Sequence, residues 1–307
     1  MKRSLLVLPP LLVLVCAGLA GASVQSVVAP GPVTALAFQG HRIAFATGFA
    51  GNDCDRVRIW NVTTGAFARL GRSTACVKTS TGTGIAALEL AGTRAVWLHY
   101  TGGNIREWTL WTATTTKPTP RRLSFVGRDV DAAPPIVLGN GDVSKLGDLL
   151  PYAVDKSVVV LRSNGSRAFG WTAPAAVVAL AARNGEVAVA TSDGKVTVLD
   201  ARAQVSRIET YSGPVSVVKL TGTGLLAQRG RTLELRTGAV ARTWPLPAGA
   251  TLEDADALRA YYVARGRVHE LTFATSSDRM VASGTNVQAE GSSVAVSSGR
   301  RVATLAG

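Results

Sequence analysis

Residues 177–200 read VVALAARNGEVAVATSDGKVTVLD, three short apolar runs separated by tight turns. The turn between the second and third runs, Ser192-Asp-Gly-Lys195, places Gly where a hairpin turn requires a positive φ. A fourth and less apolar run follows at Arg207–Tyr211. Short β-branched runs with alternating polarity, closed by Gly, Asn or Asp, are typical of β-strands. The stretch therefore predicts four antiparallel strands in a meander.

This four-strand pattern recurs along nearly the whole chain. Its units begin near Val33, Ile85, Ala132, Val177, Val215, Leu252 and Asn286. A unit of about 40 residues is too small to bury both faces of its own sheet, so neighbouring units must stack. Four-stranded units in a radial array form a β-propeller. The sequence therefore predicts an all-β fold, a β-propeller of about seven four-stranded blades, and a β-sandwich is the alternative.

The two ends of the chain predict how the ring closes. The last unit supplies three strands from Asn286 onward and lacks a fourth. A spare strand is available at 23–28, which reads SVQSVV. Pairing this N-terminal strand with the last unit would hide edges that are otherwise exposed. The unit that begins near Ala132 is the least regular, because residues 129–150 show little alternation.

Two segments carry a resemblance to known propellers. Residues 57–65 read VRIWNVTTG and resemble the third strand of a WD-repeat blade, in which Trp-Asp precedes a Thr-Gly turn. Residues 192–200, SDGKVTVLD, are similar to the same hairpin in WD-repeat and pyrroloquinoline-quinone-type propellers. The Gly-His dipeptide of WD repeats precedes none of the predicted first strands, so the Asp–His–Ser–Trp hydrogen-bond set of that family is not carried over. The chain thus resembles a divergent WD-like or quinoprotein-like propeller, which implies a scaffold that binds through a ring face.

The composition excludes several classes of protein. Of 307 residues, 47% are hydrophobic and 17% are charged, so the chain can bury a core and is not disordered. Three cysteines are too few for a disulfide-dense mini-protein. The chain has one long apolar run, which excludes a polytopic membrane protein. A globular, turn-rich and basic protein is what remains.

The first 22 residues have the order of a secretory signal peptide. Lys2-Arg3 is followed by the apolar run Leu5–Leu19 and by the small residues Ala20-Gly-Ala22. We expect cleavage after Ala22, which leaves residues 23–307 as a single propeller domain; an uncleaved anchor is the alternative. Pro9-Pro10 interrupts the run and argues against a stable spanning helix. The predicted location is secreted or periplasmic, with no stable membrane span after cleavage.

The cysteines fit that location. Removal of the signal removes Cys16 and leaves Cys54 and Cys76. In an oxidising compartment, two cysteines are expected to form a disulfide, which in the chain-entropy account stabilises the fold by about 3 kcal/mol. Two unpaired, buried thiols are the alternative. Neither cysteine has a second ligand at metal spacing, so no metal site is predicted.

The sequence contains no recognisable catalytic set. His41, His99 and His269 form no pair with metal spacing, and no G-x-S-x-G elbow is present. The densest acidic run, Glu253-Asp254 with Asp256, is interpreted as a solvated loop that enters the sixth blade. We therefore predict no catalytic residues and no cofactor, and a non-enzymatic protein.

A propeller enzyme, either a hydrolase or quinone-dependent, is the alternative function. Its site would need carboxylates or histidines from several blades that converge on the channel mouth. The predicted innermost strands are largely Ala, Val and Leu, which argues against such a cluster. A purely structural envelope module is a third possibility.

Charge placement gives the clearest functional signal. The 33 Lys and Arg exceed the 20 Asp and Glu by 13. In a propeller, the turns between second and third strands share one ring face with the connections between blades. The predicted turns on that face carry a set of cationic residues that we call the basic sector: Lys156, Lys195, Arg229, Arg231, Arg265, Arg267, Arg300 and Arg301. The plainer interpretation is that Arg and Lys simply suit exposed turns.

Such a basic sector would attract a polyanion, because Arg offers bidentate contacts to carboxylate and phosphate. For an exported protein, nucleic acid is an improbable polyanion. The predicted partner is therefore a protein or an anionic cell-envelope polymer, bound by a monomeric scaffold.

Overall fold

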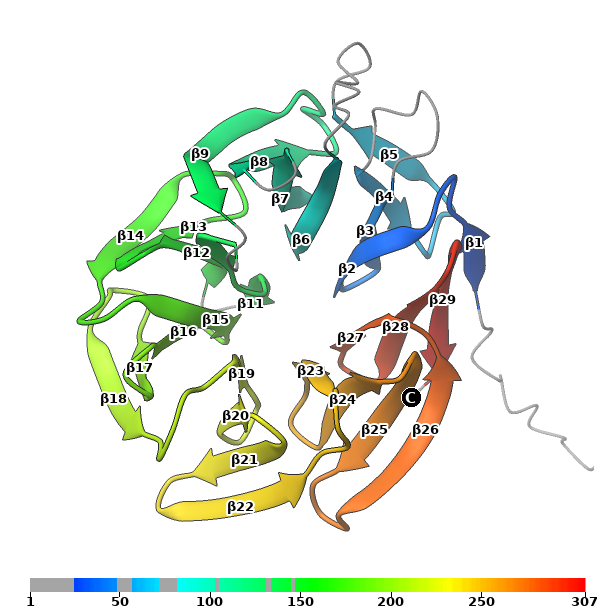
Figure 1. Cartoon of the computed structure of the whole chain (residues 1–307). Coiled ribbons are helices and arrows are strands. Elements are labelled where there is room, and N and C mark those ends of the chain that lie inside the picture. Colours follow the sequence, from blue (N-terminus) through cyan, green and yellow to red (C-terminus); the bar gives the residue numbers. More distant parts are fainter. Residues whose placement is uncertain are drawn as a thin grey trace, which may run out of the picture.

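A computed structural model describes residues 25–48, 57–71, 82–102, 105–130, 134–144 and 147–306. Over these residues the strands form seven antiparallel sheets around a central opening (Figure 1). Each sheet is one blade, and we letter its strands A to D from the innermost strand outward. The predicted all-β propeller of about seven blades is confirmed.

The blades follow the order of the sequence. Blade 1 consists of β2 (Val33–Gln39), β3 (Arg42–Thr47), β4 (Val57–Asn61) and β5 (Phe67–Leu70). Blade 2 consists of β6 (Thr83–Ala91), β7 (Arg94–Thr101), β8 (Ile105–Thr114) and β9 (Arg121–Val130). Blade 3 consists of β10 (Ile136–Leu138), β11 (Asp142–Ser144), β12 (Gly147–Val154), β13 (Ser157–Leu161) and β14 (Arg167–Thr172).

The remaining four blades are more uniform. Blade 4 consists of β15 (Val177–Arg183), β16 (Glu186–Thr191), β17 (Lys195–Leu199) and β18 (Val205–Thr210). Blade 5 consists of β19 (Val217–Leu220), β20 (Leu225–Arg229), β21 (Thr232–Thr237) and β22 (Val240–Pro245). Blade 6 consists of β23 (Thr251–Ala255), β24 (Arg259–Ala264), β25 (Arg267–Thr272) and β26 (Ser277–Ser283). Blade 7 consists of β27 (Asn286–Glu290), β28 (Ser293–Ser298), β29 (Arg301–Ala306) and β1 (Ser26–Val28).

The N-terminal strand closes the ring, as the sequence predicts. β1 pairs antiparallel with β29, and Val27 lies opposite Val302 (Figure 1). Thr304 donates its backbone N–H to the carbonyl of Gln25 over 2.9 Å, which extends the pairing beyond the strand. The first and last strands of the ring thus protect each other's backbone edge.

The core is divided into interfaces between blades. Seven clusters of buried apolar side chains occur in the described part of the chain, and each spans one pair of neighbouring blades. Trp108 and Trp111 illustrate this division, because they lie on opposite faces of β8. Trp108 packs between blades 2 and 3, whereas Trp111 packs toward blade 1. Stacking of neighbours, as the repeat size requires, is what buries the core.

Tight hairpins set the register within the blades. In the β24–β25 turn, Arg265 has a φ of 51° and Gly266 has a φ of 71°. Positive φ at both central residues matches the right-handed twist of the flanking strands. The turn at Asp193-Gly194 likewise connects β16 to β17, with Gly194 at a φ of 80°.

Blade 3 departs from the four-strand pattern. Its innermost strand is split into β10 and β11, which both pair with β12. The break is Gly139-Asn140-Gly141, where a Cβ on Gly139 would lie 2.9 Å from the Leu180 carbonyl oxygen in blade 4. A Cβ on Gly141 would clash with the Leu90 carbonyl in blade 2. Close approach of both neighbouring blades therefore explains the irregular sequence of this segment.

Several predictions concern residues outside the described part of the chain. These are the signal sequence at 1–22 and the pair Cys54 and Cys76. Within the described residues, no helix has the length and apolar character needed to cross a bilayer.

Candidate functional site

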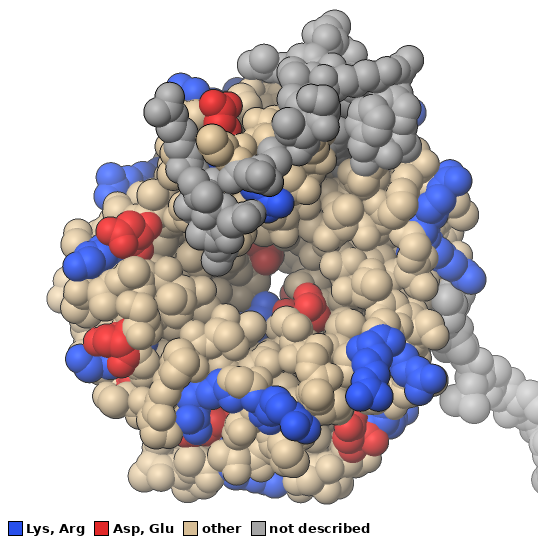
Figure 2. All heavy atoms as spheres, in the orientation of Figure 1, with Lys and Arg blue, Asp and Glu red and all other residues tan. Residues whose placement is uncertain are grey.

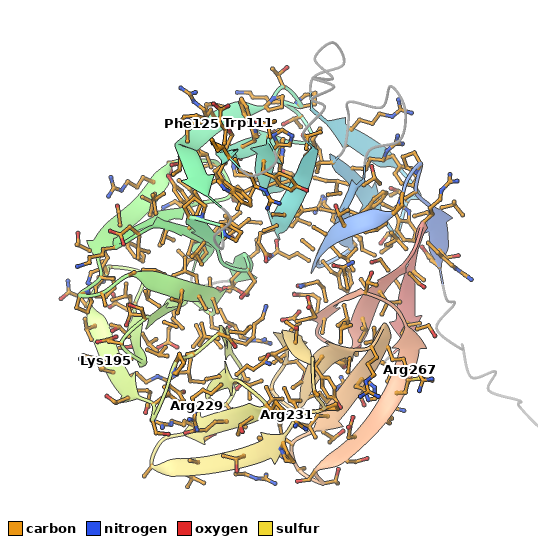
Figure 3. All side chains as sticks on the ribbon, in the orientation of Figure 1. Trp111, Phe125, Lys195, Arg229, Arg231 and Arg267 are labelled. Atoms are coloured by element: carbon orange, nitrogen blue, oxygen red, sulfur yellow. The ribbon has the colours of Figure 1, made fainter. Side chains whose placement is uncertain are left out.

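The basic sector lies where the turns between strands B and C meet one face of the ring, which we call the B–C face. The sector spans blades 3 to 7. Figure 3 shows Lys195, Arg229, Arg231 and Arg267 along the rim of the ring, and Figure 2 shows exposed Lys and Arg atoms over the same part. All members of the sector are exposed except Arg229, which is half-buried.

The residues of the basic sector differ in whether they form ion pairs with acidic side chains. Arg229 forms an ion pair with Glu234 over 2.6 Å and lies 5.9 Å from the ring centre of Tyr211. Lys195 pairs with Asp193 over 3.1 Å at the surface. Because both cations have acidic partners, they contribute less net positive charge to the face than the sequence suggests.

The two arginines of blade 7 donate hydrogen bonds to neutral groups. Arg300 donates to the Ala29 carbonyl over 2.9 Å, and Arg301 donates to Ser26 Oγ over 3.1 Å. Arg231 in blade 5 similarly donates to the Leu246 carbonyl over 3.2 Å. These contacts orient the guanidinium groups without neutralising their charge. The strongest positive part of the face is therefore Arg231 together with the four arginines of blades 6 and 7.

A second polar site, which was not predicted from the sequence, lies inside the ring. Carboxylates from several blades converge on the central channel: Glu89, Asp142, Glu253, Asp254 and Glu290. Two cations, Lys219 and Arg183, lie among them. Most of these groups line a cavity of about 140 Å³, and Figure 2 shows acidic and basic atoms inside the opening. We call these seven residues the channel cluster.

Burial raises the pKa of four carboxyls of the channel cluster. Burial raises the pKa of Glu89 to about 8, helped by the charges of Asp254 and Glu253 and opposed by Lys219 and by the Gly141 N–H. Burial raises the pKa of Glu253 to about 7, and Asp254 adds to this rise. The pKa values of Asp142 and Glu290 are also raised, mainly by burial. The channel therefore holds protons on some carboxyls at neutral pH.

Asp254 is held by two backbone N–H groups and lies near a lysine. Its Oδ2 accepts the Ala289 N–H over 2.7 Å, its Oδ1 accepts the Ala255 N–H over 2.8 Å, and Lys219 Nζ lies 3.8 Å from Oδ1. These contacts link β23 to β27 and β19. Asp254 thus joins blades 5, 6 and 7 at the inner wall.

Two interpretations from the sequence are wrong here. The acidic run at 253–256 is not a solvated loop, because Glu253 and Asp254 belong to β23, and Asp254 and Asp256 are 8% and 6% exposed. The largely Ala, Val and Leu composition of the innermost strands also does not exclude a converging cluster, because these strands carry Glu89, Lys219 and Asp254. A bulge between Leu252 and Asp254 inserts one extra residue into β23, which allows adjacent carboxylates to enter the interior. The channel cluster could have been suspected from the charged residues Glu89 and Lys219 within the predicted innermost runs.

No histidine belongs to the basic sector or to the channel cluster. His41 is in the turn between β2 and β3, and His99 is on β7. His269 on β25 stacks on Tyr262 and lies 3.3 Å from Asp278 Oδ1 through its Nδ1. In the described ranges, no three His, Cys, Asp or Glu side chains are placed to hold a metal ion.

Known proteins resemble this chain in fold and not in sequence. No protein-family model matches it, and no curated protein is similar to it in sequence. A chain in the crystal structure of the mitotic checkpoint complex matches with a TM-score of 0.56 and 12% identity, over 91% of this chain and 90% of that one. Raptor from Chaetomium thermophilum matches with a TM-score of 0.56 and 12% identity, over 92% of this chain and 28% of that one. These similarities show a β-propeller fold.

Proposed function

We propose that this chain is a non-enzymatic binding scaffold that holds an anionic partner on its B–C face. The observation that carries the proposal is the run of guanidinium groups on consecutive turns of blades 5 to 7, most of them exposed. Arg231, Arg300 and Arg301 donate to neutral oxygen atoms and so keep their net charge. Exposed arginines in one sector of a rigid ring create a field that favours carboxylate- or phosphate-rich ligands.

The cellular location of the protein forms part of this proposal. Residues 1–22 have the order of a signal peptide, so the mature chain would be residues 23–307, secreted or periplasmic, with Cys54 and Cys76 oxidised. The partner is then a protein or an anionic component of the cell envelope, and not a nucleic acid. The propeller in the mitotic checkpoint complex is one chain of an assembly. A comparable role in assembly suits a ring that presents one charged face.

Charge reversal tests the proposal. We expect Arg231→Glu, Arg265→Glu and Arg301→Glu together to weaken binding of fluorescein-labelled poly-L-glutamate by roughly thirtyfold at low salt, about 2 kcal/mol over three exposed contacts. Arg231 is chosen over Arg229 because reversal of Arg229 would also break its ion pair with Glu234.

The matched control reverses three exposed cations on turns between strands C and D, on the opposite face: Lys117→Glu, Arg162→Glu and Arg202→Glu. This variant has the same net charge and is expected to bind nearly as the unmodified chain does. Equal loss in both variants would show that only net charge matters, and the basic-sector proposal would then be wrong.

A second candidate function rests on the channel cluster. Converging carboxyls with raised pKa values are typical of sites that transfer protons, so the propeller-enzyme alternative now has a specific location. Glu89→Gln and Glu253→Gln should then abolish any hydrolytic activity found in a screen of glycoside and ester substrates. Activity that survives both substitutions would exclude the channel as its site.

A further inference from the structure

An apolar groove opens beside the basic sector at the junction of blades 6 and 7. It has a volume of about 380 Å³ and is lined by Ser283, Val296, Ser298, Arg301, Ala303 and Leu305. The pairing of β28 with β29 places Val296 opposite Ala303 and Ser298 opposite Arg301. Directly paired residues point to the same face of a sheet, so these side chains form one continuous surface. We call this feature the β26–β29 groove.

The inner part of the groove is apolar, and its mouth is cationic. Val296 and Ala303 are buried, while Ser283, Ser298 and Arg301 at the B–C end are exposed. Arg301 is the guanidinium that lines the mouth, whereas Arg267 pairs with Ala264 on the face of blade 6 that packs against blade 5. Figure 3 shows Arg267 on the rim near this junction. The nearest turns add Arg265 and Arg300.

The adjoining strand extends the apolar surface outward. β1 pairs with β29 so that Val28 lies opposite Arg301 on the same sheet face. Val28 is 75% exposed, the largest value among the large hydrophobic residues of the described chain. An exposed apolar residue beside a partly open apolar groove, rimmed by charge, has the anatomy of a binding hot spot.

We propose that the β26–β29 groove takes a bulky apolar side chain of a partner protein, and that acidic residues flanking that side chain pair with Arg301 and with the arginines of the nearest turns. This inference rests on the proposed function and specifies its partner as an acidic peptide segment with one apolar anchor. The volume suits a large side chain with part of its neighbour. The charge at the mouth requires flanking carboxylates, because each nearby turn contributes arginine.

Two labelled peptides test the groove directly. The probes are Gly-Asp-Glu-Trp-Glu-Asp-Gly and the same peptide with Ser in place of Trp, and binding is measured by fluorescence anisotropy. Burial of the anchor is expected to favour the Trp peptide by about tenfold to a hundredfold. Ala303→Phe fills the groove from within, and Ser283→Trp covers its mouth from an exposed position. Both variants should reduce the preference to within about threefold and leave binding of the Ser peptide unchanged.

Matched controls separate the groove from the charged face. Ser292→Trp, in the exposed turn between β27 and β28 on the opposite face, should keep the full preference for Trp. Because Ser283 is exposed, its replacement does not disturb the core, so Ser283→Trp reports on the groove even if Ala303→Phe fails to fold.

The outcomes distinguish the groove proposal from the broader proposal of an anion-binding face. Equal binding of both peptides, with loss of both in the charge-reversed triple variant, would overturn the groove and leave the binding face intact. If neither acidic peptide bound, both the groove and the binding face would be contradicted. Groove-dependent binding of phosphatidylglycerol vesicles that is tighter than binding of the Trp peptide would show that the groove takes a lipid, and it would overturn the inference. Tighter groove-dependent binding of a synthetic peptide of residues 1–24 would show that the groove takes the chain's own N-terminus, and it would overturn the inference as well.

Discussion

Glu89 provides the sharpest test of how the channel is built. It projects from β6, the innermost strand of blade 2, into a space shared with Asp254, Glu253 and Lys219. Burial raises its pKa from 4.5 to about 8. The folded ring therefore holds the proton of Glu89 more tightly than the unfolded chain does. Deprotonation of this residue should destabilise the fold.

The sign and size of the effect follow from the two pKa values. Stability linked to Glu89 is complete below pH 4.5 and is lost as the pH rises through about 8. At about 1.4 kcal/mol for each pKa unit, the free energy of unfolding should fall by roughly 2 to 3 kcal/mol between pH 5 and pH 7. Gln carries no proton to lose and can still accept the Gly141 N–H, so Glu89→Gln should remove this part of the pH dependence.

Urea unfolding at pH 5, 7 and 8.5 measures the effect. The unmodified chain should be most stable at pH 5, and Glu89→Gln should become the more stable protein by pH 8.5. Glu107→Gln, an exposed position on β8, serves as the control and should track the unmodified chain. If Glu89→Gln retained the full slope between pH 5 and pH 8.5, the account of a buried, proton-holding channel would be wrong.

Three further predictions concern stability and oxidation. Glu234→Ala should lower the free energy of unfolding by about 2 kcal/mol, because it leaves Arg229 and Arg236 without their shared carboxylate. Glu209→Ala removes a single ion pair that is more exposed, and it should lower the free energy of unfolding by under about 1 kcal/mol in the same urea assay. Gly224→Ala would drive a Cβ against the Arg236 carbonyl and should cost about 3 kcal/mol, while Gly238→Ala, with a φ of +58° and nothing within 4 Å, should cost about 1 kcal/mol; equal losses would contradict the steric argument. Cys54→Ser should free the thiol of Cys76 for alkylation and lower the free energy of unfolding by about 3 kcal/mol, and thiols that react equally before and after reduction would exclude the disulfide.

The regular blades could be predicted from the sequence because their signals are local. In blade 4, alternating residues and the Asp193-Gly194 turn specify hairpins without reference to the rest of the chain. Ring closure was also predictable, since a chain with one strand missing at its end and one spare at its start has a single economical pairing. The split inner strand of blade 3 was not predictable, because glycine is required at 139 and 141 by the close approach of Leu180 and Leu90 from the neighbouring blades.

The candidate site was likewise only partly predictable from the sequence. The positions of the basic sector followed from hairpin turns and are found on one face. The ion pair of Arg229 with Glu234 depends on side-chain packing across the β20–β21 hairpin, which periodicity does not reveal. The channel cluster brings together residues from blades 2, 3, 4, 5, 6 and 7. Such convergence depends on the ring geometry, so Glu89 stood out only as a charge within an otherwise apolar run.

Hydrogen–deuterium exchange with and without poly-L-glutamate tests the central claim most directly, because it locates the bound polyanion on the ring. We predict slower exchange in the turns at 229–232, 264–267 and 298–301, and unchanged exchange in the turns at 115–120, 162–166 and 200–204 on the opposite face. Protection confined to the opposite face, or to the channel residues 89, 140–142 and 254, would contradict a binding scaffold that works through the B–C face.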